Sequence, residues 1–434
     1  MKLQIEKAVY GGAGLAHQTE GADEGKTVFV PFTLPGEVIE ARVLEQKKTF
    51  GEASLIKVLK ASKNRIQPTC AHFGECGGCQ YQHAAYPAQL SMKSAILLET
   101  LQRAGLTALP TITTHTGEPW GYRNRTRFRI SELNEAIQFG YNRRGSNDFL
   151  PVHECPISAP LLVHAAQSLL RIAVENPAVA RWLRSATEVE FFTTDDEKKL
   201  QMTLFVSTQQ SGFSAFCERL KQLVPELAGA GVSILATKEP QQRAKKVQPL
   251  ASWGADGLAY TAAGEKYWVS RGGFFQVNRF LIDKFVQLVT DGRHGSLAWD
   301  LYAGVGLFSR ALAGAFQQVV AVEAAAGDLT NSFKGPGRRA LQTTTVDFLR
   351  GAVVQRDRPD LIVMDPPRAG VGAEVCSLLA RVAAPEIIYV SCDPVTLARD
   401  LRSLTQSGYT IAELHLVDMF PQTFHLETIA VLRK

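Results

Sequence analysis

One cysteine near the end of the sequence has the surroundings that covalent chemistry requires. Cys392 stands in the sequence YVSCDP, directly after an apolar run that we expect to be a strand. A thiol at the carboxyl end of a strand, flanked by turn residues, is placed to act as a nucleophile. A single cysteine is more often a buried structural residue, and we assign Cys217 and Cys376 to that class because their surroundings are apolar and helix-like.

A glycine turn follows another expected strand and is a candidate nucleotide-binding loop. The sequence DLYAGVG contains Tyr302, Gly304 and Gly306. Glycines at a strand-to-helix turn let the backbone approach a ligand closely. Glu323 ends the next apolar run about twenty residues on, where a carboxylate can accept hydrogen bonds from a ribose diol.

Two aspartates complete this candidate site. Asp365 begins the sequence DPPR at the end of a fourth expected strand, which places it beside the ligand crevice of a parallel sheet. A third strand should precede Asp347, a candidate adenine contact. A dehydrogenase is the alternative for a lone Gly-x-Gly turn, but Ser309 occupies the position of the third glycine, and DPPR does not fit a dehydrogenase.

The elements that must position these side chains suggest three regions. In residues 266–434, near-continuous apolar strands alternate with helical stretches, which predicts a parallel, doubly wound Rossmann-like α/β domain. Closely spaced short strands in residues 1–60 predict a small β-barrel. Residues 61–265 have a mixed α+β pattern, with an amphipathic helix over 90–106 that we expect to pack on the catalytic domain.

Four other cysteines have the spacing of a metal site. A C-x5-C-x2-C sequence is followed by a distant cysteine that precedes a proline, and the four are Cys70, Cys76, Cys79 and Cys155. Four thiolates suit either tetrahedral zinc or an iron–sulfur cluster, and the spacing by itself slightly favours zinc.

Arginine alternates with other residues in the sequence YRNRTRFR, residues 122–129. On a strand this spacing puts Arg123, Arg125, Arg127 and Arg129 on one face. Like charges on one face repel unless a polyanion or carboxylates lie opposite. We therefore predict a phosphate-binding strand, with a solvated strand as the alternative.

The composition narrows the class of protein. The chain has 434 residues, 45% of them hydrophobic and 21% charged, which is typical of a globular protein and unlike a disordered one. We see no apolar run long enough to span a bilayer and no signal-peptide pattern at the start, and we expect a cytoplasmic monomer. Seven cysteines without a secretory signal argue against a disulfide scaffold, and the net charge of +5 permits a polyanionic partner.

Taken together, these motifs resemble those of RNA uracil-C5 methyltransferases. The sequences FFQVN, DLYAGVG, DPPR, SCDP and HLET occur in that family's order, and the resemblance covers essentially the whole chain. Residues 1–60 resemble the RNA-binding TRAM domain, and the barrel with the cysteine cluster looks like the 23S ribosomal RNA enzymes of the RlmD type. The resemblance, with the proline after Cys155, favours [4Fe-4S] over zinc.

The resemblance also implies residue roles. Cys392 would add to C6 of uracil, S-adenosylmethionine would supply the methyl group to C5, and Glu427 would remove the C5 proton. The implied S-adenosylmethionine contacts, in addition to the glycine turn, are Gln276, Tyr302, Glu323, Asp347 and Asp365.

Three alternatives remain open at this point. A tRNA uracil-C5 methyltransferase would use the same chemistry, although that type generally lacks the barrel. An adenine-N6 methyltransferase also uses a D-P-P motif, but it would leave Cys392 and Glu427 without a role. A non-catalytic, cluster-bearing RNA-binding protein would not bind S-adenosylmethionine.

Overall fold

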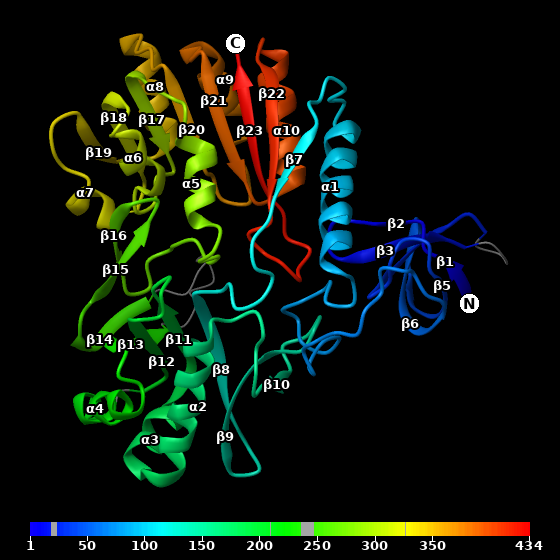
Figure 1. Cartoon of the computed structure of the whole chain (residues 1–434), viewed down its shortest axis with the longest axis vertical. Helices are drawn as coiled ribbons and strands as arrows, with labels where there is room; N and C mark the ends of the chain where they lie inside the picture. The colour runs from blue at the N-terminus through cyan, green and yellow to red at the C-terminus, as the bar shows by residue number, and fades with distance from the viewer. Residues whose placement is uncertain (19–23, 209, 236–246, 326) are drawn as a thin grey trace. The chain divides into compact units, whose positions relative to one another are not determined.

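The computed structural model (Figure 1) divides into two units, which are described separately. It describes residues 1–18, 24–208, 210–235, 247–325 and 327–434. Unit 1 consists of Met1–Pro119, Leu349–Arg358 and Met364–Lys434. Unit 2 consists of Trp120–Phe348 and Pro359–Val363.

Unit 1 begins with a curled six-stranded sheet, which we call the N-terminal sheet. Its strand order is β1-β5-β6-β4-β3-β2. The strands are β1 (Lys2–Gln4), β2 (Lys7–Ala8), β3 (Ala13–His17), β4 (Thr27–Pro31), β5 (Val38–Gln46) and β6 (Phe50–Lys60). Alternation along β4 buries Val28 and Val30, which pack with Leu3 and Ile39 into a small core. This period of two is what the sequence predicts for a half-buried sheet.

The C-terminal part of unit 1 is an α/β arrangement with one reversed strand. Its sheet order is β21-β23-β22-β7, and β23 runs antiparallel to both of its neighbours. The elements are β7 (Ile112–His115), α9 (Gly372–Val382), β21 (Glu386–Ser391), α10 (Pro394–Gln406), β22 (Thr410–Val417) and β23 (Glu427–Arg433). The reversal departs from the all-parallel prediction, and it arises because no helix crosses over between β22 and β23.

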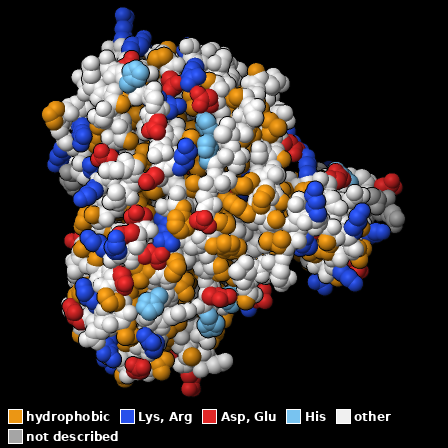
Figure 2. Space-filling model, in the orientation of Figure 1, with side chains coloured by type: hydrophobic (Ala, Val, Ile, Leu, Met, Phe, Trp, Pro, Cys, Tyr) orange, Lys and Arg blue, Asp and Glu red, His pale blue; other side chains and the backbone are white. Residues whose placement is uncertain are grey.

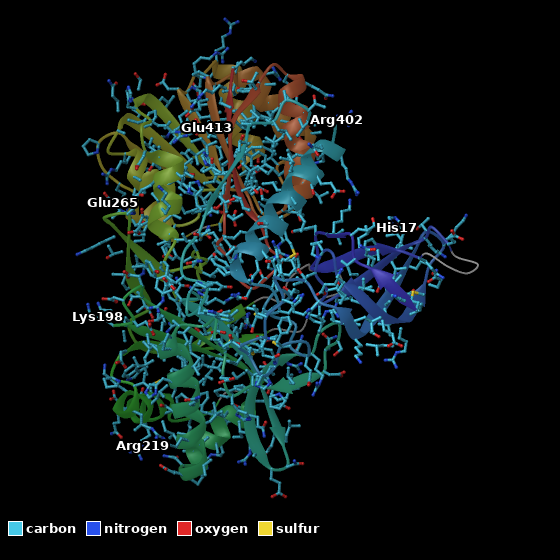
Figure 3. The ribbon with its side chains drawn as sticks, turned by 45° about the vertical axis from the view of Figure 1, so that its right-hand side comes forward. His17, Lys198, Arg219, Glu265, Arg402 and Glu413 are labelled. Carbon is cyan, nitrogen blue, oxygen red and sulfur yellow. The ribbon has the colours of Figure 1, made fainter. Side chains whose placement is uncertain are left out.

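Arg433 on β23 ties the three strands together at the carboxyl end of the chain. Its guanidinium donates to Glu386 on β21 at 2.9 Å and to Glu413 on β22 at 2.9 Å. Glu413 is labelled in Figure 3. These are partly exposed ion pairs, so we attribute the stability of this sheet to its apolar strands.

Helix α1 (Tyr86–Arg103) starts and ends earlier than the predicted helix over 90–106. Pro87 lies in its first turn, where the fixed φ of proline favours helix initiation. Gly105 has a φ of +85°, which ends the helix in the left-handed region that glycine tolerates. Figure 1 shows α1 beside β7 and α10, and the helix contacts both elements within unit 1.

Unit 2 contains a seven-stranded sheet of order β10-β9-β8-β11-β12-β13-β14. The strands are β8 (Arg125–Leu133), β9 (Ala136–Asn142), β10 (Phe149–Pro151), β11 (Ala186–Thr193), β12 (Leu200–Val206), β13 (Leu227–Leu235) and β14 (Val247–Gly254). Helices α2 (Pro160–Glu175), α3 (Pro177–Ser185) and α4 (Phe213–Leu223) pack with it around Trp182 and Phe191.

The rest of unit 2 carries the parallel strands that the sequence predicts. Strands β17 (Gly295–Leu301), β18 (Phe316–Glu323) and β19 (Arg338–Gln342) pair in parallel, with β20 (Leu361–Met364) next to β17 in the strand order. The accompanying elements are β15 (Gly257–Ala262), β16 (Glu265–Ser270), α5 (Ile282–Thr290), α6 (Leu307–Leu312), α7 (Asp328–Ser332) and α8 (Thr345–Gln355), the last of which continues into unit 1. Within the described residues, no helix is long and apolar enough to cross a membrane.

Candidate active site and cofactor loop

The glycine turn after β17 has the backbone conformation that a tight ligand-binding loop requires. Tyr302, Gly304 and Gly306 have φ values of +63°, +56° and +83°. Glu323, at the end of β18, accepts the N–H of Gly304 at 3.0 Å and that of Ala325 at 2.8 Å. Glu323, the carboxylate expected to bind a ribose diol, therefore lies against the glycine turn. A carboxylate beside such a turn fits a nucleoside ligand.

Gln276 lies on a loop that the start of the arginine-rich segment holds in place. The buried side chain of Asn124 donates to the carbonyl oxygen of Gln276 at 2.9 Å, and its N–H donates to the carbonyl oxygen of Val277, also at 2.9 Å. The N–H of Arg279 bonds to the carbonyl oxygen of Tyr122 at 3.0 Å. Asn124 is a positioning residue for Gln276 that motif reading did not identify.

Asp300 is a buried carboxyl group directly before the glycine turn. The hydroxyl of Ser309 donates to it, and burial raises the pKa of Asp300 to about 7. The hydrogen bonds from Ser309 oppose that rise, whereas the charge of Glu323 adds to it. Ser309 thus has a hydrogen-bonding role at the position where a dehydrogenase would have its third glycine.

Asp347 lies in the first turn of α8, after β19, as the sequence predicts. Its carboxylate accepts the hydroxyl of Thr344 at 2.7 Å, and the same hydroxyl accepts the N–H of Asp347 at 3.1 Å. This reciprocal pair caps the helix. The proposed adenine contact remains a prediction.

In unit 1, the strand register places Cys392 and Glu427 side by side. Ser391 on β21 pairs with Thr428 on antiparallel β23. Cys392 follows one member of that pair and Glu427 precedes the other, so the two side chains occupy neighbouring positions at the end of the sheet. Cys392 is partly buried, and Glu427 is 4% exposed.

Electrostatic coupling shows that these groups share one site. Burial raises the pKa of Cys392 to about 11, with further increases from Glu427 and Asp365, and Arg368 opposes the rise. Burial also raises the pKa of Glu427 well above its ordinary value, again reinforced by Asp365 and opposed by Arg368. Asp365, predicted near the cofactor, therefore lies close to both proposed catalytic residues.

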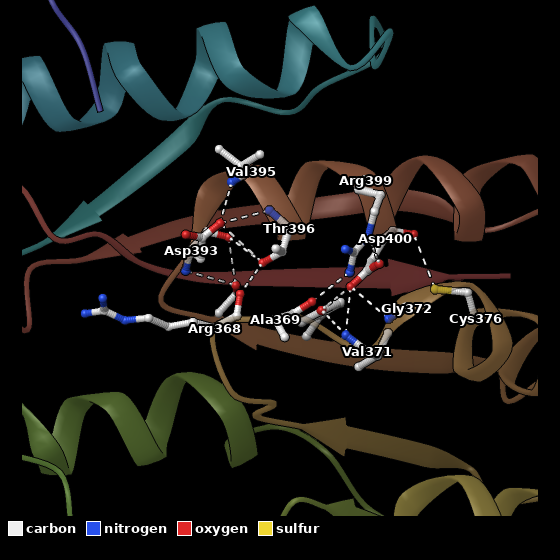
Figure 4. Close-up of polar contacts among 12 residues, drawn as sticks. Arg368, Ala369, Val371, Gly372, Cys376, Asp393, Val395, Thr396, Arg399 and Asp400 are labelled. Carbon is white, nitrogen blue, oxygen red and sulfur yellow. Dashed lines mark hydrogen bonds and ion pairs between the residues drawn. The ribbon is translucent and has the colours of Figure 1, made fainter. Parts of the chain in front are cut away.

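Helix α10 holds the backbone around Arg368 (Figure 4). The hydroxyl of Thr396 donates to the carbonyl oxygen of Arg368 at 3.0 Å, and Arg399 donates to that of Ala369 at 2.9 Å. Buried Asp400 accepts the N–H of Val371 at 2.8 Å. The loop after DPPR is therefore fixed by side chains from the helix that begins just beyond Cys392.

Helix α1 holds the loop that leads to Glu427. Lys93 is completely buried, and its ammonium donates to Asp418 at 2.6 Å and to the carbonyl oxygen of Phe420 at 2.9 Å. Gln89 exchanges two hydrogen bonds with Gln422, through side chain and backbone, at 2.9 and 3.0 Å. Helix α1 therefore stabilises the loop that leads to Glu427, the proposed base.

The proposed cluster cysteines are partly exposed. The sulfur of Cys76 accepts the N–H of Gly78 at 3.4 Å. Within the described residues, no group of three or more Cys, His, Asp or Glu side chains is arranged to hold a metal ion. Cys217 and Cys376 are buried, as expected for structural thiols, and burial raises the pKa of Cys376 to about 12.

The arginine-rich segment differs from the predicted strand in two ways. Arg123 lies before β8, because its backbone bonds to Ile157 and Ala159 instead of to a neighbouring strand. Arg125 and Arg127 form ion pairs with carboxylates of β11. Carboxylates therefore lie opposite these arginines, which is the alternative to a polyanion. Glu188 pairs with Arg127, and Glu190 lies 3.3 Å from Arg125.

Arg129 is also bound within the protein. Its guanidinium donates to the side chain of Asn142 at 2.6 Å and to the backbone carbonyl of Asn147 at 2.7 Å. Because three of the four arginines have internal partners, their spacing no longer requires a phosphate ligand.

Four exposed lysines lie along β6 and in the segments on either side of it, on a sheet where Figure 2 shows basic side chains interspersed with acidic ones, and we call this set the lysine group. Its members are Lys48, Lys57, Lys60 and Lys63. Arg65, close by in the sequence, is different, because it donates to the buried carboxylate of Glu37 at 2.6 Å.

Comparisons with known proteins agree with this architecture. A model described as tRNA (Uracil-5-)-methyltransferase matches residues 85–335 and 339–434, and a TRAM domain model matches residues 3–56. An uncharacterized RNA methyltransferase of Aquifex aeolicus is 33% identical over 451 residues, covering 100% of this chain and 98% of the relative. The 23S rRNA (uracil(1939)-C(5))-methyltransferase RlmD of Acinetobacter baylyi is 31% identical over 458 residues, covering 100% and 95%.

A solved structure shares the fold. The tRNA (uracil-54, C5)-methyltransferase of Pyrococcus abyssi, in complex with S-adenosyl-L-homocysteine, superimposes with a TM-score of 0.73 at 21% identity. The match covers 100% of both chains. The predicted combination of a Rossmann-like methyltransferase fold with an N-terminal TRAM domain is confirmed.

Proposed function

Since this chain belongs to the tRNA (uracil-5-)-methyltransferase family of S-adenosylmethionine-dependent RNA methyltransferases, we propose that Cys392 and Glu427 carry out uracil-C5 methylation. The observation that carries the proposal is the β21–β23 register, which sets a thiol beside a buried carboxyl group. An adenine-N6 methyltransferase requires neither group.

The proposed reaction divides one difficult step into easier ones. S-adenosylmethionine supplies an electrophilic methyl group, and the glycine turn, Gln276 and Glu323 are the residues proposed to hold it. The thiolate of Cys392 adds to C6 of uracil, which makes C5 nucleophilic toward that methyl group. Glu427 then takes the C5 proton, and the electrons of the C–H bond restore the C5–C6 double bond as the thiolate leaves C6.

Arg368 is the group of this site that supports the attacking thiolate. Burial raises the pKa of Cys392 to about 11, which disfavours the thiolate, and the guanidinium of Arg368 opposes that rise. Burial raises the pKa of Glu427, which makes its carboxylate a stronger base than an exposed one. The charge of Glu427 raises the pKa of Cys392. We propose that the thiol proton of Cys392 passes to water as the thiolate forms, and that Glu427, ionised at the later step, takes the C5 proton.

Two substitutions test the mechanism. Cys392→Ala should abolish methyl transfer and keep S-adenosylmethionine binding, whereas Cys376→Ala, which removes a buried thiol, is the matched control. Glu427→Gln should stall elimination and leave methylated RNA bound through C6, seen as a slow band on a denaturing gel with labelled methyl groups. Near wild-type turnover by Cys392→Ala would falsify the nucleophile assignment.

We propose 23S ribosomal RNA as the substrate, because the Acinetobacter baylyi relative with that activity is similar over the full length of this chain. The solved tRNA enzyme keeps tRNA as the second candidate. Mapping 5-methyluridine in 23S rRNA and tRNA from a strain that lacks the gene separates the two. Loss from tRNA alone would refute the ribosomal assignment.

We further propose that the protein is a cytoplasmic monomer organised as regions 1–60, 61–265 and 266–434. We also propose that the lysine group contacts RNA phosphates. Its four side chains are exposed on a sheet that matches the TRAM domain. Among the arginines, Arg127 is the most exposed, and we retain it as an RNA contact in the proposal. Arg125 and Arg129 are assigned to their contacts within the protein, and Arg123, which lies before β8, stays a proposed RNA contact.

For the cysteines, we propose a [4Fe-4S] cluster on Cys70, Cys76, Cys79 and Cys155. Their spacing and partial exposure support it, as does the N–H···S bond to Cys76, a type of contact that stabilises a thiolate ligand. The proposal rests on these features, because no group of three or more Cys, His, Asp or Glu side chains is arranged to hold a metal ion within the described residues. No step of methyl transfer depends on this cluster.

A further inference from the structure

The turn between β2 and β3 brings a tyrosine of the N-terminal sheet to the segment after β21 that carries Cys392, which we call the catalytic loop. The hydroxyl of Tyr10 donates to Oδ2 of Asp393 at 3.3 Å, across 383 positions of sequence. Its ring meets that of Phe424 edge-on, with centroids 5.4 Å apart. Phe424 lies on the loop that leads to Glu427. Tyr10 therefore contacts one side chain next to each proposed catalytic residue's segment, Asp393 after Cys392 and Phe424 before Glu427.

Asp393 has two separate tasks, one for each carboxylate oxygen. Oδ1 accepts the N–H of Val395 at 3.0 Å and of Thr396 at 2.9 Å, which caps α10. Oδ2 is the oxygen that accepts the tyrosine hydroxyl. Since Asp393 directly follows Cys392, the contacts that hold its carboxylate restrain the backbone from which the thiol projects.

The tyrosine is held rigidly enough to fix Asp393. Lys7 on β2 forms an ion pair with Glu99 on α1 at 2.5 Å. Gly12, in the same turn as Tyr10, has a φ of +90°, and a Cβ there would lie 2.9 Å from the Cβ of Gln80 and 3.5 Å from that of Phe424. The turn is therefore anchored through Lys7 before the tyrosine and through close packing at Gly12 after it.

The N-terminal sheet and the catalytic strands also share one apolar core. Tyr10 packs against this shared core. Its buried members are Ala8, Leu34, Tyr81, Ala84, Met92, Ile96, Leu416 and Leu426. Leu426 directly precedes Glu427, so the same core supports the hairpin turn and the proposed base.

We propose that Tyr10 is a positioning residue of the active site, which fixes Asp393 and thereby the Cys392 thiol in the orientation for attack on uracil C6. This inference rests on the proposed function. Burial raises the pKa of Tyr10, so its hydroxyl keeps the proton that it donates to Asp393 at physiological pH. The other charged or ionisable groups that face Tyr10 are Arg368 and Cys392 itself.

The central test is Tyr10→Phe in the full-length protein. This variant keeps the ring contact with Phe424 and loses only the hydroxyl. We expect kcat for RNA methylation to fall about 10–100-fold, the scale at which misplacing a reacting group slows a reaction. The KM for RNA and the Kd for S-adenosylmethionine should stay within about twofold of wild type, since neither ligand is held by the hydroxyl.

A second measurement, alkylation of Cys392 by iodoacetamide across pH, needs no substrate. Without the tyrosine hydroxyl, the Asp393 charge is less neutralised, so the alkylation profile of Tyr10→Phe should move to higher pH. Tyr409→Phe is the matched control, because it removes another buried hydroxyl of unit 1, which donates to the carbonyl oxygen of Ala384 at 2.8 Å. The control should leave both the profile and kcat unchanged.

A double-mutant cycle with Asp393→Asn completes the test. Asparagine keeps the helix cap, and if the two residues act through one hydrogen bond, the double variant should be no slower than the slower single variant. Wild-type kcat in Tyr10→Phe, or a rise in KM for RNA with kcat unchanged, would overturn the proposal. Activity in Cys392→Ala would instead refute the proposed function. In that case, the alkylation profiles of wild type and Tyr10→Phe would still show whether Tyr10 acts on the Cys392 thiol.

Discussion

Replacing Lys93 by methionine would leave a buried carboxylate without its counter-ion. Both side chains of the Lys93–Asp418 pair are completely buried, and the ammonium also donates to the carbonyl oxygen of Phe420. Methionine preserves most of the apolar stem and its packing along α1, so the substitution isolates the loss of the charge and its hydrogen bonds.

The expected cost follows from that burial. Removing one partner of a buried ion pair typically costs about 3–5 kcal/mol, because the remaining charge is uncompensated in a medium of low polarity. A domain of 150–250 residues loses roughly 2–4 °C of Tm per kcal/mol, so the Tm of unit 1 should fall by roughly 6–20 °C.

The reverse substitution should be milder. In Asp418→Asn, Lys93 can lose its proton, because burial lowers its pKa. The double variant Lys93→Met with Asp418→Leu should recover most of the lost stability, since apolar replacement of a buried pair is often neutral or stabilising.

Calorimetry and guanidinium unfolding of the three variants provide the measurement. The order of stability should be wild type and double variant above Asp418→Asn, with Lys93→Met lowest. A Tm loss below about 2 °C for Lys93→Met, or a double variant as unstable as that single variant, would refute the reasoning.

Four further outcomes can be measured. In Arg368→Ala, alkylation of Cys392 should require higher pH, because that guanidinium lowers the pKa of the thiol; an unchanged profile contradicts the proposed electrostatics. The folded-state pKa of Asp300 is raised to about 7 from 3.8, so it holds a proton that the unfolded chain has lost, and stability should fall as pH rises between these values. In Asp300→Asn this slope should flatten in denaturant titrations at several pH values, whereas an unaltered slope assigns the titration to another group. Anaerobic protein should contain about four irons and be brown, and zinc in place of iron would overturn the cluster. Reversing the charges of the lysine group to glutamate should weaken RNA binding and flatten its salt dependence without changing S-adenosylmethionine affinity, and equal RNA affinity would remove this surface from recognition.

The strands and the helix at the catalytic loop could be predicted because their causes are local. The apolar runs of β17, β18, β20 and β21 are near-continuous, as expected for strands covered on both faces, and the structure confirms them. The predicted ends of α1 were less accurate. The helix begins at a proline turn and ends before a left-handed glycine, and both ends lie a few residues before the predicted ones.

Other features depend on partners that are distant in the sequence. Nothing near Tyr10 indicates that its hydroxyl reaches Asp393, and nothing near Lys93 indicates Asp418. The arginine-rich segment has the same limit, because the partners of its side chains are also distant in the sequence. Three of its arginines lie on β8 as predicted, but the carboxylates that partner Arg125 and Arg127 lie on β11, about sixty residues later.

The shared core has a consequence for how such enzymes can be rearranged. An appended domain that folds around its own core can be exchanged between proteins or joined by a flexible linker. Here Ala8 and Leu34 contribute to the same core as Leu416 and Leu426, so cutting the chain after the N-terminal sheet would expose apolar surface under the catalytic loop. A chimera that exchanges this sheet between relatives should therefore exchange α1 and the loop before β23 with it, as one inherited block.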